Sequence, residues 1–335
     1  YYNVHYLTQC NFQASRLQYV LRSVIILFAI FVFYLVITER KLNQLERAKT
    51  RGPFESDKSS HDGSHRLAVI IPFRERFTEL QQLLPHLAEF LSNQSVNHAF
   101  YVINQVDNYR FNRGALLNVG VLESGRSFCV CPSQTFTQYP CQKSNQPSSL
   151  SCFSETDYVA LHDVDLLPID PALDYSYPVN GGPLHLIPAA LHPRYYWYKL
   201  FFGGIVILSR ARFLALNGFS NQFWGWGRED DEFRLRVLRA NLTISTPVGV
   251  KSGSHAFKFI HNEYAHPRDT VTYNRPDVKQ IFRELSGGVD SIKYTVQSQT
   301  VMTINGIPAV VFNVHLNCDQ SSVICNPFTA SQPPV

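Results

Sequence analysis

Apolar runs and helix-type patterns alternate along the first half of the folded region. LAVIIP (67–72), which ends at a proline, and AFYVINQ (99–105) are almost wholly apolar, as is typical of strands buried on both faces of a sheet. A helix with one apolar face is predicted after each strand. The apolar positions are Phe77, Leu80, Leu83, Leu84, Leu87 and Leu91 in the first helix, and Ala115, Leu116, Val119 and Leu122 in the second, which begins near Asn112. This alternation predicts an α/β fold with a largely parallel sheet.

The second half of the chain predicts two further strands and a hairpin. DYVALHDVDLLP (157–168) is the third strand, and YYWYKLFFGGIVILS (195–209) runs from an aromatic patch into a fourth. A later helix is expected to end at about Ala240. Alternating apolar residues on both sides of Asn305-Gly306 predict a β-hairpin, because Asn-Gly favours the tight turns that join antiparallel strands.

Residues 17–38 form an apolar stretch with an unbroken apolar run from Val24 to Ile37. As a helix it is about long enough to cross the roughly 30 Å hydrocarbon layer of a membrane. No small-residue cleavage site follows, so an uncleaved signal anchor is favoured, with a buried core helix as the alternative. The expected organisation is a short cytoplasmic N-terminus (1–16, incomplete because the sole methionine is Met302), the anchor (17–38), a stem (39–65), the folded domain (66–328) and a tail (329–335).

Composition narrows the compartment and the class of partner. The net charge is +4 and the basic residues are scattered, so nucleic-acid binding is not supported. Cys318 and Cys325 have only His315 nearby, which favours a small disulfide loop over a zinc site. Sequons at Asn93 and Asn241 are compatible with a lumenal environment. Together these features favour a lumenal body.

Residues 125–153 interrupt the regular pattern. They contain four of the seven cysteines together with Pro, Ser and Gln, and they show neither a helix nor a strand period. Three accounts remain open: a surface insertion with one or two local disulfides, a translated intron or faulty gene model, and a zinc loop, which the absence of histidine disfavours.

Polar side chains follow the first strand, where ligands of α/β sheets bind. Arg74 and Arg76 have the chemistry of a bidentate phosphate clamp, and Phe73 has the face on which a base would stack. The alternative is a solvated start of a helix. The chain has no GxGxxG motif and no P-loop, which argues against NAD enzymes and ATPases.

A second group of polar side chains follows the third strand. Asp163 and Asp165 flank Val164, which points the other way, so both carboxylates are expected on one face. Near the two arginines, such a pair suggests a divalent ion that holds a diphosphate. An ordinary Asp-rich turn is the alternative.

The stretch NGFSNQFWGWGREDDEFRLR (217–236) combines tryptophans, glycines and acids. Glycines around Trp224 and Trp226 allow turns that expose the indole faces, and Glu229, Asp230, Asp231 and Glu232 follow as a helix would begin. Aromatic platforms with carboxylates suit a hydroxyl-rich ligand such as a sugar. Alternatively, the acids complement the helix dipole and the tryptophans belong to the core. Downstream, His255, His261 and His266 are either metal ligands or solvated loop histidines.

The motifs PFRER, NRGALLNVG, HDVDLLP, FFGGIVILS, NGFSNQFWGWGREDDEF and HLNCD occur in this order. With them the chain resembles the β-1,4-galactosyltransferase family over about residues 66–328, apart from 125–153. The FRER, REDDEF and DSIKY forms are most similar to members that add galactose to xylose on proteoglycan core proteins. The resemblance implies a GT-A fold, an inverting reaction with Mn²⁺ and UDP-galactose, and a Golgi type II membrane protein.

The resemblance also implies roles for individual residues. Asp230 would be the catalytic base and Asp165 a manganese ligand with His261. The donor site would comprise Pro72, Phe73, Arg74, Arg76, Phe111, Arg113, Asp163, Val164, Asp165 and Trp226. The acceptor site would comprise Tyr196, Tyr198, Trp226, Glu229, Asp230 and Asp231.

One position departs from the family pattern. Xylose-specific members carry a His-x-His metal pair, whereas this chain reads Phe259-Ile260-His261. His255 is the residue that would compensate after a rearrangement of the loop, or the site would bind metal with fewer protein ligands. The resemblance leaves two alternatives to the xylose-specific enzyme: a galactosyltransferase acting on N-acetylglucosamine, and an inactive, lectin-like binding protein.

Overall fold

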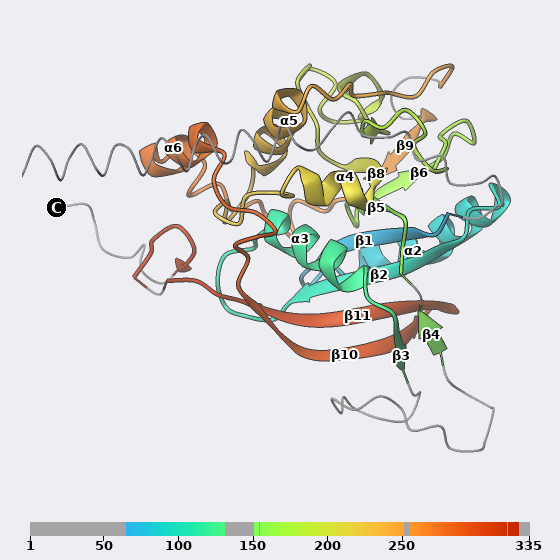
Figure 1. Ribbon diagram of the computed structural model, residues 1–335, viewed down its shortest axis with the longest axis horizontal. Coiled ribbons are helices and arrows are strands. Elements are labelled where there is room, and N and C mark those ends of the chain that lie inside the picture. Colours follow the sequence, from blue (N-terminus) through green and yellow to red (C-terminus); the bar gives the residue numbers. More distant parts are fainter. Residues whose placement is uncertain (1–64, 131–150, 154, 251–254, 320, 328–335) are drawn as a thin grey trace, which may run out of the picture. The chain divides into compact units, whose positions relative to one another are not determined.

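The computed structural model describes residues 65–130, 151–153, 155–250, 255–319 and 321–327 (Figure 1). The apolar stretch 17–38 lies outside them. Within the described ranges, no helix has both the length and the apolar character needed to cross a membrane.

A seven-stranded sheet forms the centre of the described domain, in the order β10-β11-β2-β1-β5-β8-β7. Its strands are β1 (Leu67–Phe73), β2 (His98–Gln105), β5 (Tyr158–His162), β7 (Leu184–His185), β8 (Ile205–Ser209), β10 (Tyr294–Ile304) and β11 (Ile307–Leu316). The central strands β11, β2, β1 and β5 are parallel, whereas β10 at one edge and β8 and β7 at the other pair antiparallel to their neighbours. The α/β class is therefore confirmed, with a parallel centre and antiparallel edges.

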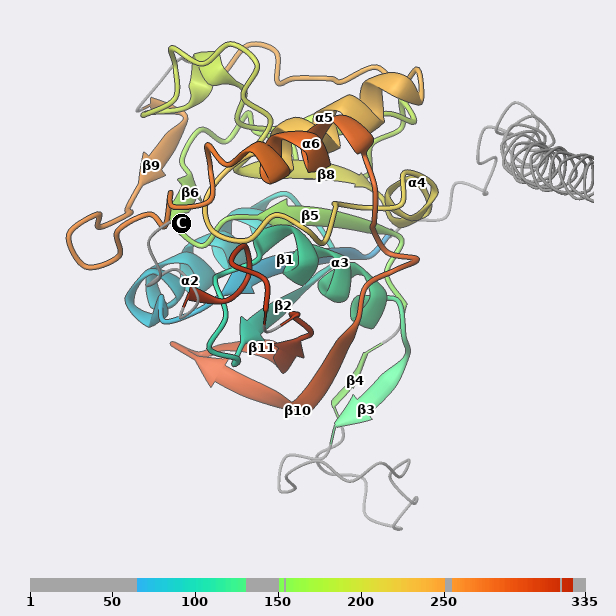
Figure 2. The same cartoon turned by 90° about the vertical axis from the view of Figure 1, so that its left-hand side faces the viewer.

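Helices cover both faces of the sheet. They are α2 (Phe77–Asn93), α3 (Arg113–Ser124), α4 (Arg210–Ala215), α5 (Glu229–Arg239) and α6 (Pro276–Glu284). Alternate residues of β1 point to opposite faces: Val69 packs in a core with α2, and Ile70 packs in a second core with α3 and α5. Figure 2 shows α2 and α3 on opposite sides of β1. Burial on both faces explains why the β1 and β2 sequences are continuously apolar.

The hairpin expected at the end of the chain is confirmed. β10 and β11 pair antiparallel across Asn305 and Gly306, whose φ angles are 47° and 85°. Two consecutive positive φ angles are those of the tight hairpin turn that Asn-Gly favours. The hairpin adds β11 to the parallel side of β2 and leaves β10 at the edge of the sheet (Figure 1).

Two predicted segments differ from the structure in detail. The segment 157–168 is two strands, β5 and β6 (Leu166–Pro168), because the chain turns after His162. β6 leaves the main sheet and pairs antiparallel with β9 (Phe257–Phe259). The ends of 125–153, expected to lack strand structure, form an antiparallel ladder between β3 (Phe128–Val130) and β4 (Ser151–Phe153). Residues 131–150 lie outside the described ranges.

Close packing of α3 on β1 and β2 gives the first testable prediction. A methyl group on Gly120 would overlap the side chain of Ile70 and press on Ile103. Because this core is rigid, Gly120→Ala is expected to lower the free energy of unfolding by about 1–3 kcal/mol, measured by urea denaturation. Gly125→Ala is the matched control, since the atoms nearest to its methyl group belong to the guanidinium at the far end of the Arg210 side chain. Equal stability of both variants would contradict the packing argument.

Candidate active site

The ends of the central parallel strands form the edge at which candidate residues gather. Pro72 and Phe73 end β1, the loop 106–112 follows β2, and Asp163 and Asp165 follow β5. This is the edge of an α/β sheet where ligands bind. The start of α5 lies over the same region, because Gly225 N–H donates to the carbonyl of Phe111 (2.8 Å).

Arg113 joins the candidate residues of three elements. Its Nε donates to Asp163 Oδ1 (2.6 Å), and one terminal nitrogen donates to Asp230 Oδ1 (2.6 Å) and lies 3.6 Å from Glu229 Oε1. The guanidinium is largely buried, with 14% of the side chain exposed. The structure thus brings Asp163, Glu229 and Asp230 together around one cation.

The same arrangement sets the protonation of the carboxyl groups. Burial raises the pKa of Glu229 to about 8, with a further contribution from the charge of Asp230. Burial also raises the pKa of Asp163 to about 6, against the opposing effect of Arg113. For Arg113, burial disfavours the charge, but the three carboxylates raise its pKa above its ordinary value. Glu229 is therefore mainly protonated at neutral pH, beside the ion pair of Arg113 and Asp230.

The four acids at the start of α5 have different partners. Asp230 pairs with Arg113, and Asp231 accepts a hydrogen bond from the hydroxyl of Tyr198 (2.8 Å). Glu232 instead forms a buried ion pair with Arg236 one turn later (2.7 Å), so it is structural. The turn before the helix needs positive φ at Gly225 (86°) and Gly227 (97°).

The two tryptophans also differ. Trp224 is buried, whereas Trp226 is 39% exposed. The N–H of Trp226 donates to the carbonyl of Asp269 (2.7 Å), and the guanidinium of Arg268 lies 5.3 Å from its ring centroid. The segment after β9 therefore packs against the exposed tryptophan and holds it at the site.

Asp165 and His261 form the candidate metal site. His261 Nδ1 lies 3.1 Å from Asp165 Oδ2 and 2.8 Å from Arg76 Nη1, and its buried Nε2 has no hydrogen-bond partner among the described residues. Carboxylate oxygen and imidazole nitrogen are ligand types that suit a first-row divalent ion, and it is Nδ1, not the unpartnered Nε2, that faces Asp165. The described residues contain no cluster of three or more His, Cys, Asp and Glu side chains that could hold a metal.

Phe259 contacts this pair, whereas the two other candidate histidines, His255 and His266, have different environments. The ring of Phe259 stacks on His261, with 5.7 Å between centroids. His266 Nε2 lies 3.9 Å from Glu79, and His255 is exposed. His266 contacts Glu79 rather than Asp165, and His255 lies at the surface, so neither histidine joins the Asp165–His261 pair.

The two arginines after β1 bind different groups. Arg74 donates to the carbonyls of Asp107 (3.0 Å) and Tyr109 (2.7 Å), and it lies 5.8 Å from the ring centroid of Phe111. Arg76 contacts Glu79 and His261. In this arrangement Arg74 shapes the loop after β2, whereas Arg76 lies at the candidate metal pair.

The predicted acceptor residues line two places. Tyr198 contacts Asp231, as described above, and the exposed Tyr196 lines a cavity of about 920 Å³ together with Arg194, His261 and Tyr264. Val164, in the turn between Asp163 and Asp165, is buried in the core beside α2.

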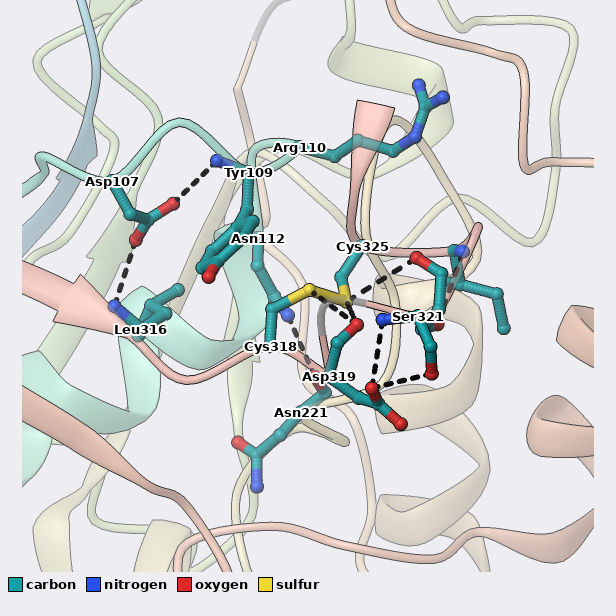
Figure 3. Close-up of a disulfide and its surroundings, with 12 residues drawn as sticks. Asp107, Tyr109, Arg110, Asn112, Asn221, Leu316, Cys318, Asp319, Ser321 and Cys325 are labelled. Atoms are coloured by element: carbon teal, nitrogen blue, oxygen red, sulfur yellow. Dashed lines mark hydrogen bonds between the residues drawn. A yellow bond between two sulfur atoms is a disulfide. The ribbon is translucent and has the colours of Figure 1, made fainter. Parts of the chain in front are cut away.

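A disulfide between Cys318 and Cys325 closes a loop beside the candidate site (Figure 3). The carbonyl of Cys325 accepts the N–H of Arg110 (2.8 Å), and Asp107 accepts the N–H of Leu316 (2.9 Å). The loop after β2 is therefore tied to the C-terminal segment. Arg110 in turn forms an ion pair with Asp269.

Sequence reasoning missed several contributors. Asp107, Asp269 and Gly203 act through tertiary contacts that no local pattern indicates. The pairing of Glu232 with Arg236 was available from their spacing, because residues four apart share a helix face.

Comparisons with known proteins find relatives of this chain. Two family models match: the N-terminal region of glycosyl transferase group 7 at residues 31–131, and the N-terminal domain of galactosyltransferase at residues 183–262. Mouse β-1,4-galactosyltransferase 7 is 42% identical over 260 residues, which are 78% of this chain and 70% of the relative. Xylosylprotein 4-β-galactosyltransferase of Caenorhabditis elegans is 34% identical over 258 residues, 76% of this chain and 80% of the relative.

A solved structure matches over almost its whole length. It is a mutant of Drosophila β1,4-galactosyltransferase 7 in complex with manganese, UDP-Gal and xylobiose. The TM-score is 0.63 at 38% identity, and the match covers 77% of this chain and 96% of that chain. The GT-A fold implied by the sequence resemblance is thereby confirmed, and this chain belongs to the β-1,4-galactosyltransferase family.

Proposed function

We propose that this chain is an inverting galactosyltransferase that moves galactose from UDP-galactose to the 4-hydroxyl of xylose on proteoglycan core proteins. The observation that supports the proposal is the contact of Arg113 with both Asp163, the proposed donor-side acid, and Asp230, the proposed acceptor-side acid. The relatives support this choice of substrates: the nematode protein is named for xylosylprotein, and the Drosophila structure contains UDP-Gal and xylobiose.

The donor side of the proposed site is the edge where β1, β2 and β5 end. We assign to it Pro72, Phe73, Arg74, Arg76, Phe111, Arg113, Asp163, Val164, Asp165 and Trp226. Mn²⁺ is the proposed cofactor, and Asp165 and His261 would hold it. When bound, the ion supplies positive charge that stabilises the diphosphate leaving group. With only this pair from the protein, the remaining ligands would come from the diphosphate and water.

The acceptor side is formed by the start of α5 and the segment before β8. Asp230 is the proposed base: it accepts the proton of the xylose 4-hydroxyl as that oxygen attacks the anomeric carbon from the face opposite to UDP. Protonated Glu229 donates a hydrogen bond to a sugar oxygen, and Asp231, held by Tyr198, accepts one. Trp226 and Tyr196 would supply exposed aromatic faces to different parts of the acceptor.

The proposed location is the Golgi membrane. Residues 17–38 would be the signal anchor of a single-pass type II protein, 1–16 its cytoplasmic side and 39–65 the stem, with the domain 66–328 in the lumen. The disulfide between Cys318 and Cys325 is consistent with an oxidising compartment.

Acceptor preference is the first test of the proposal. With UDP-galactose and Mn²⁺, the protein is expected to galactosylate a β-xyloside and to leave N-acetylglucosamine largely unmodified in a competition assay read by mass spectrometry. Preference for N-acetylglucosamine would show that the protein is instead the alternative galactosyltransferase, which acts on that sugar. Binding of the xyloside without product from either acceptor would support the inactive, lectin-like alternative.

Removal of the base is the second test. Asp230→Asn keeps the shape of the side chain but cannot accept the proton, so kcat is expected to fall by about 10²–10⁴-fold. Binding of UDP, measured by calorimetry with Mn²⁺ present, is expected to persist. Asp174→Asn, at an exposed turn, is the matched control. Unchanged turnover in the Asp230 variant would exclude Asp230 as the base.

Protonation of Glu229 is tested through stability. Between the ordinary pKa of 4.5 and about 8, folded Glu229 retains a proton that the unfolded chain releases, so this group lowers the free energy of unfolding as pH rises through that window. Glu229→Gln lacks the ionisation. Its stability relative to the unmodified protein is expected to rise by on the order of 1–3 kcal/mol between about pH 5 and pH 8 in urea denaturation. A difference independent of pH would contradict protonation of Glu229.

A further inference from the structure

Both oxygens of the Asp230 carboxylate have a defined environment. Oδ1 accepts a hydrogen bond of 2.6 Å from Arg113, as described above. Oδ2 lies against the backbone of Gly203, where an added methyl group would overlap this oxygen and press on the ring of Phe201 (3.0 Å). The carboxylate is therefore confined from two sides, by a cation on one and by a bare backbone on the other.

Gly203 is a glycine for reasons of space. It is absent from the glycines with positive φ, whereas its neighbour Gly204 has φ 78° and needs the freedom of glycine for its backbone. An alanine at 203 would thus meet no backbone strain of that kind. What it would disturb is the position of Asp230.

Arg113 is held on a rigid support. Asn112 caps α3 by accepting the N–H of Ala115 (2.9 Å), and its own N–H donates to the side chain of Gln105 (2.9 Å). The preceding loop is tied to the carbonyl of Cys325 through the N–H of Arg110. A guanidinium mounted in this way can fix the geometry of its partners, because its planar fork holds two carboxylates at once.

We propose that Arg113 and Gly203 are positioning residues that hold the Asp230 carboxylate in the orientation needed for proton transfer. Arg113 fixes Oδ1, and Gly203 leaves the space that Oδ2 occupies. This role is additional to any contact of Arg113 with the donor, and it rests on the proposed transfer with Asp230 as base. A carboxylate displaced by about 1 Å is enough to lower the rate by about 10²-fold.

Steady-state kinetics separate positioning from donor binding. Arg113→Lys keeps the charge, but its ammonium lacks the planar fork, so kcat is expected to fall by about 10²-fold, a larger factor than any rise in the KM for UDP-galactose. Gly203→Ala is expected to give the same pattern. Arg126→Lys is the matched control, since Arg126 is exposed and pairs only with Glu123 in the described structure. A raised KM with unchanged kcat in both test variants would assign donor binding alone and overturn the proposal.

A double-mutant comparison tests the route of the effect. If Arg113 and Gly203 act through Asp230, either substitution added to Asp230→Asn costs no further activity, whereas independent roles give losses that multiply. Multiplied losses would overturn the proposal even if single variants are slow. Calorimetric binding of UDP with Mn²⁺ shows that each variant is folded. Absence of turnover in the unmodified protein would instead overturn the proposed function, and the positioning role with it.

Discussion

One buried guanidinium makes the site possible. Asp163, Glu229 and Asp230 gather in a partly buried site, where like charges about 4 Å apart repel by roughly 4 kcal/mol at an effective dielectric constant of 20. Arg113 offsets this repulsion by hydrogen bonding to two of the carboxylates. The third, Glu229, retains a proton, chiefly because it is buried and further because of the charge of Asp230. Burial and the contacts of Arg113 together therefore set the charge of the site.

The fold is arranged to make that interaction. α3 begins at Arg113 because Asn112 caps it, β5 ends in the turn that carries Asp163, and two glycines with positive φ allow α5 to start at Glu229. These segments are far apart in sequence and meet only at the edge where the parallel strands end. The disulfide loop fixes the loop before α3, because the carbonyl of Cys325 accepts the N–H of Arg110. The segment after β9 fixes Trp226, because the carbonyl of Asp269 accepts its N–H. Packing of the two cores thus determines the geometry of the chemistry.

The sequence patterns predicted the helices and strands better than they predicted the contacts between them. Local signals were sufficient for β1, β2, α2 and the Asn305-Gly306 hairpin, because residues close together in the sequence determine which face is buried and which turn forms. The antiparallel direction of β8 was not predictable in this way, since it depends on how residues 163–204 return to the sheet. The pairing of Arg113 with Asp163 and Asp230 spans 50 and 117 residues, and only the tertiary fold reveals it. Among the four acids of α5, the partner of Glu232 could be assigned from the sequence, since Arg236 follows four residues later.

The configuration of the bond that the protein forms tests the account most directly. NMR of the product from UDP-galactose and a β-xyloside reports both the anomeric configuration of the galactose and the xylose oxygen that carries it. Attack by a hydroxyl deprotonated by Asp230, from the face opposite to UDP, predicts a β-linked galactose on O4 of xylose. An α-linked product, or galactose on another oxygen, would contradict the proposed geometry of the site.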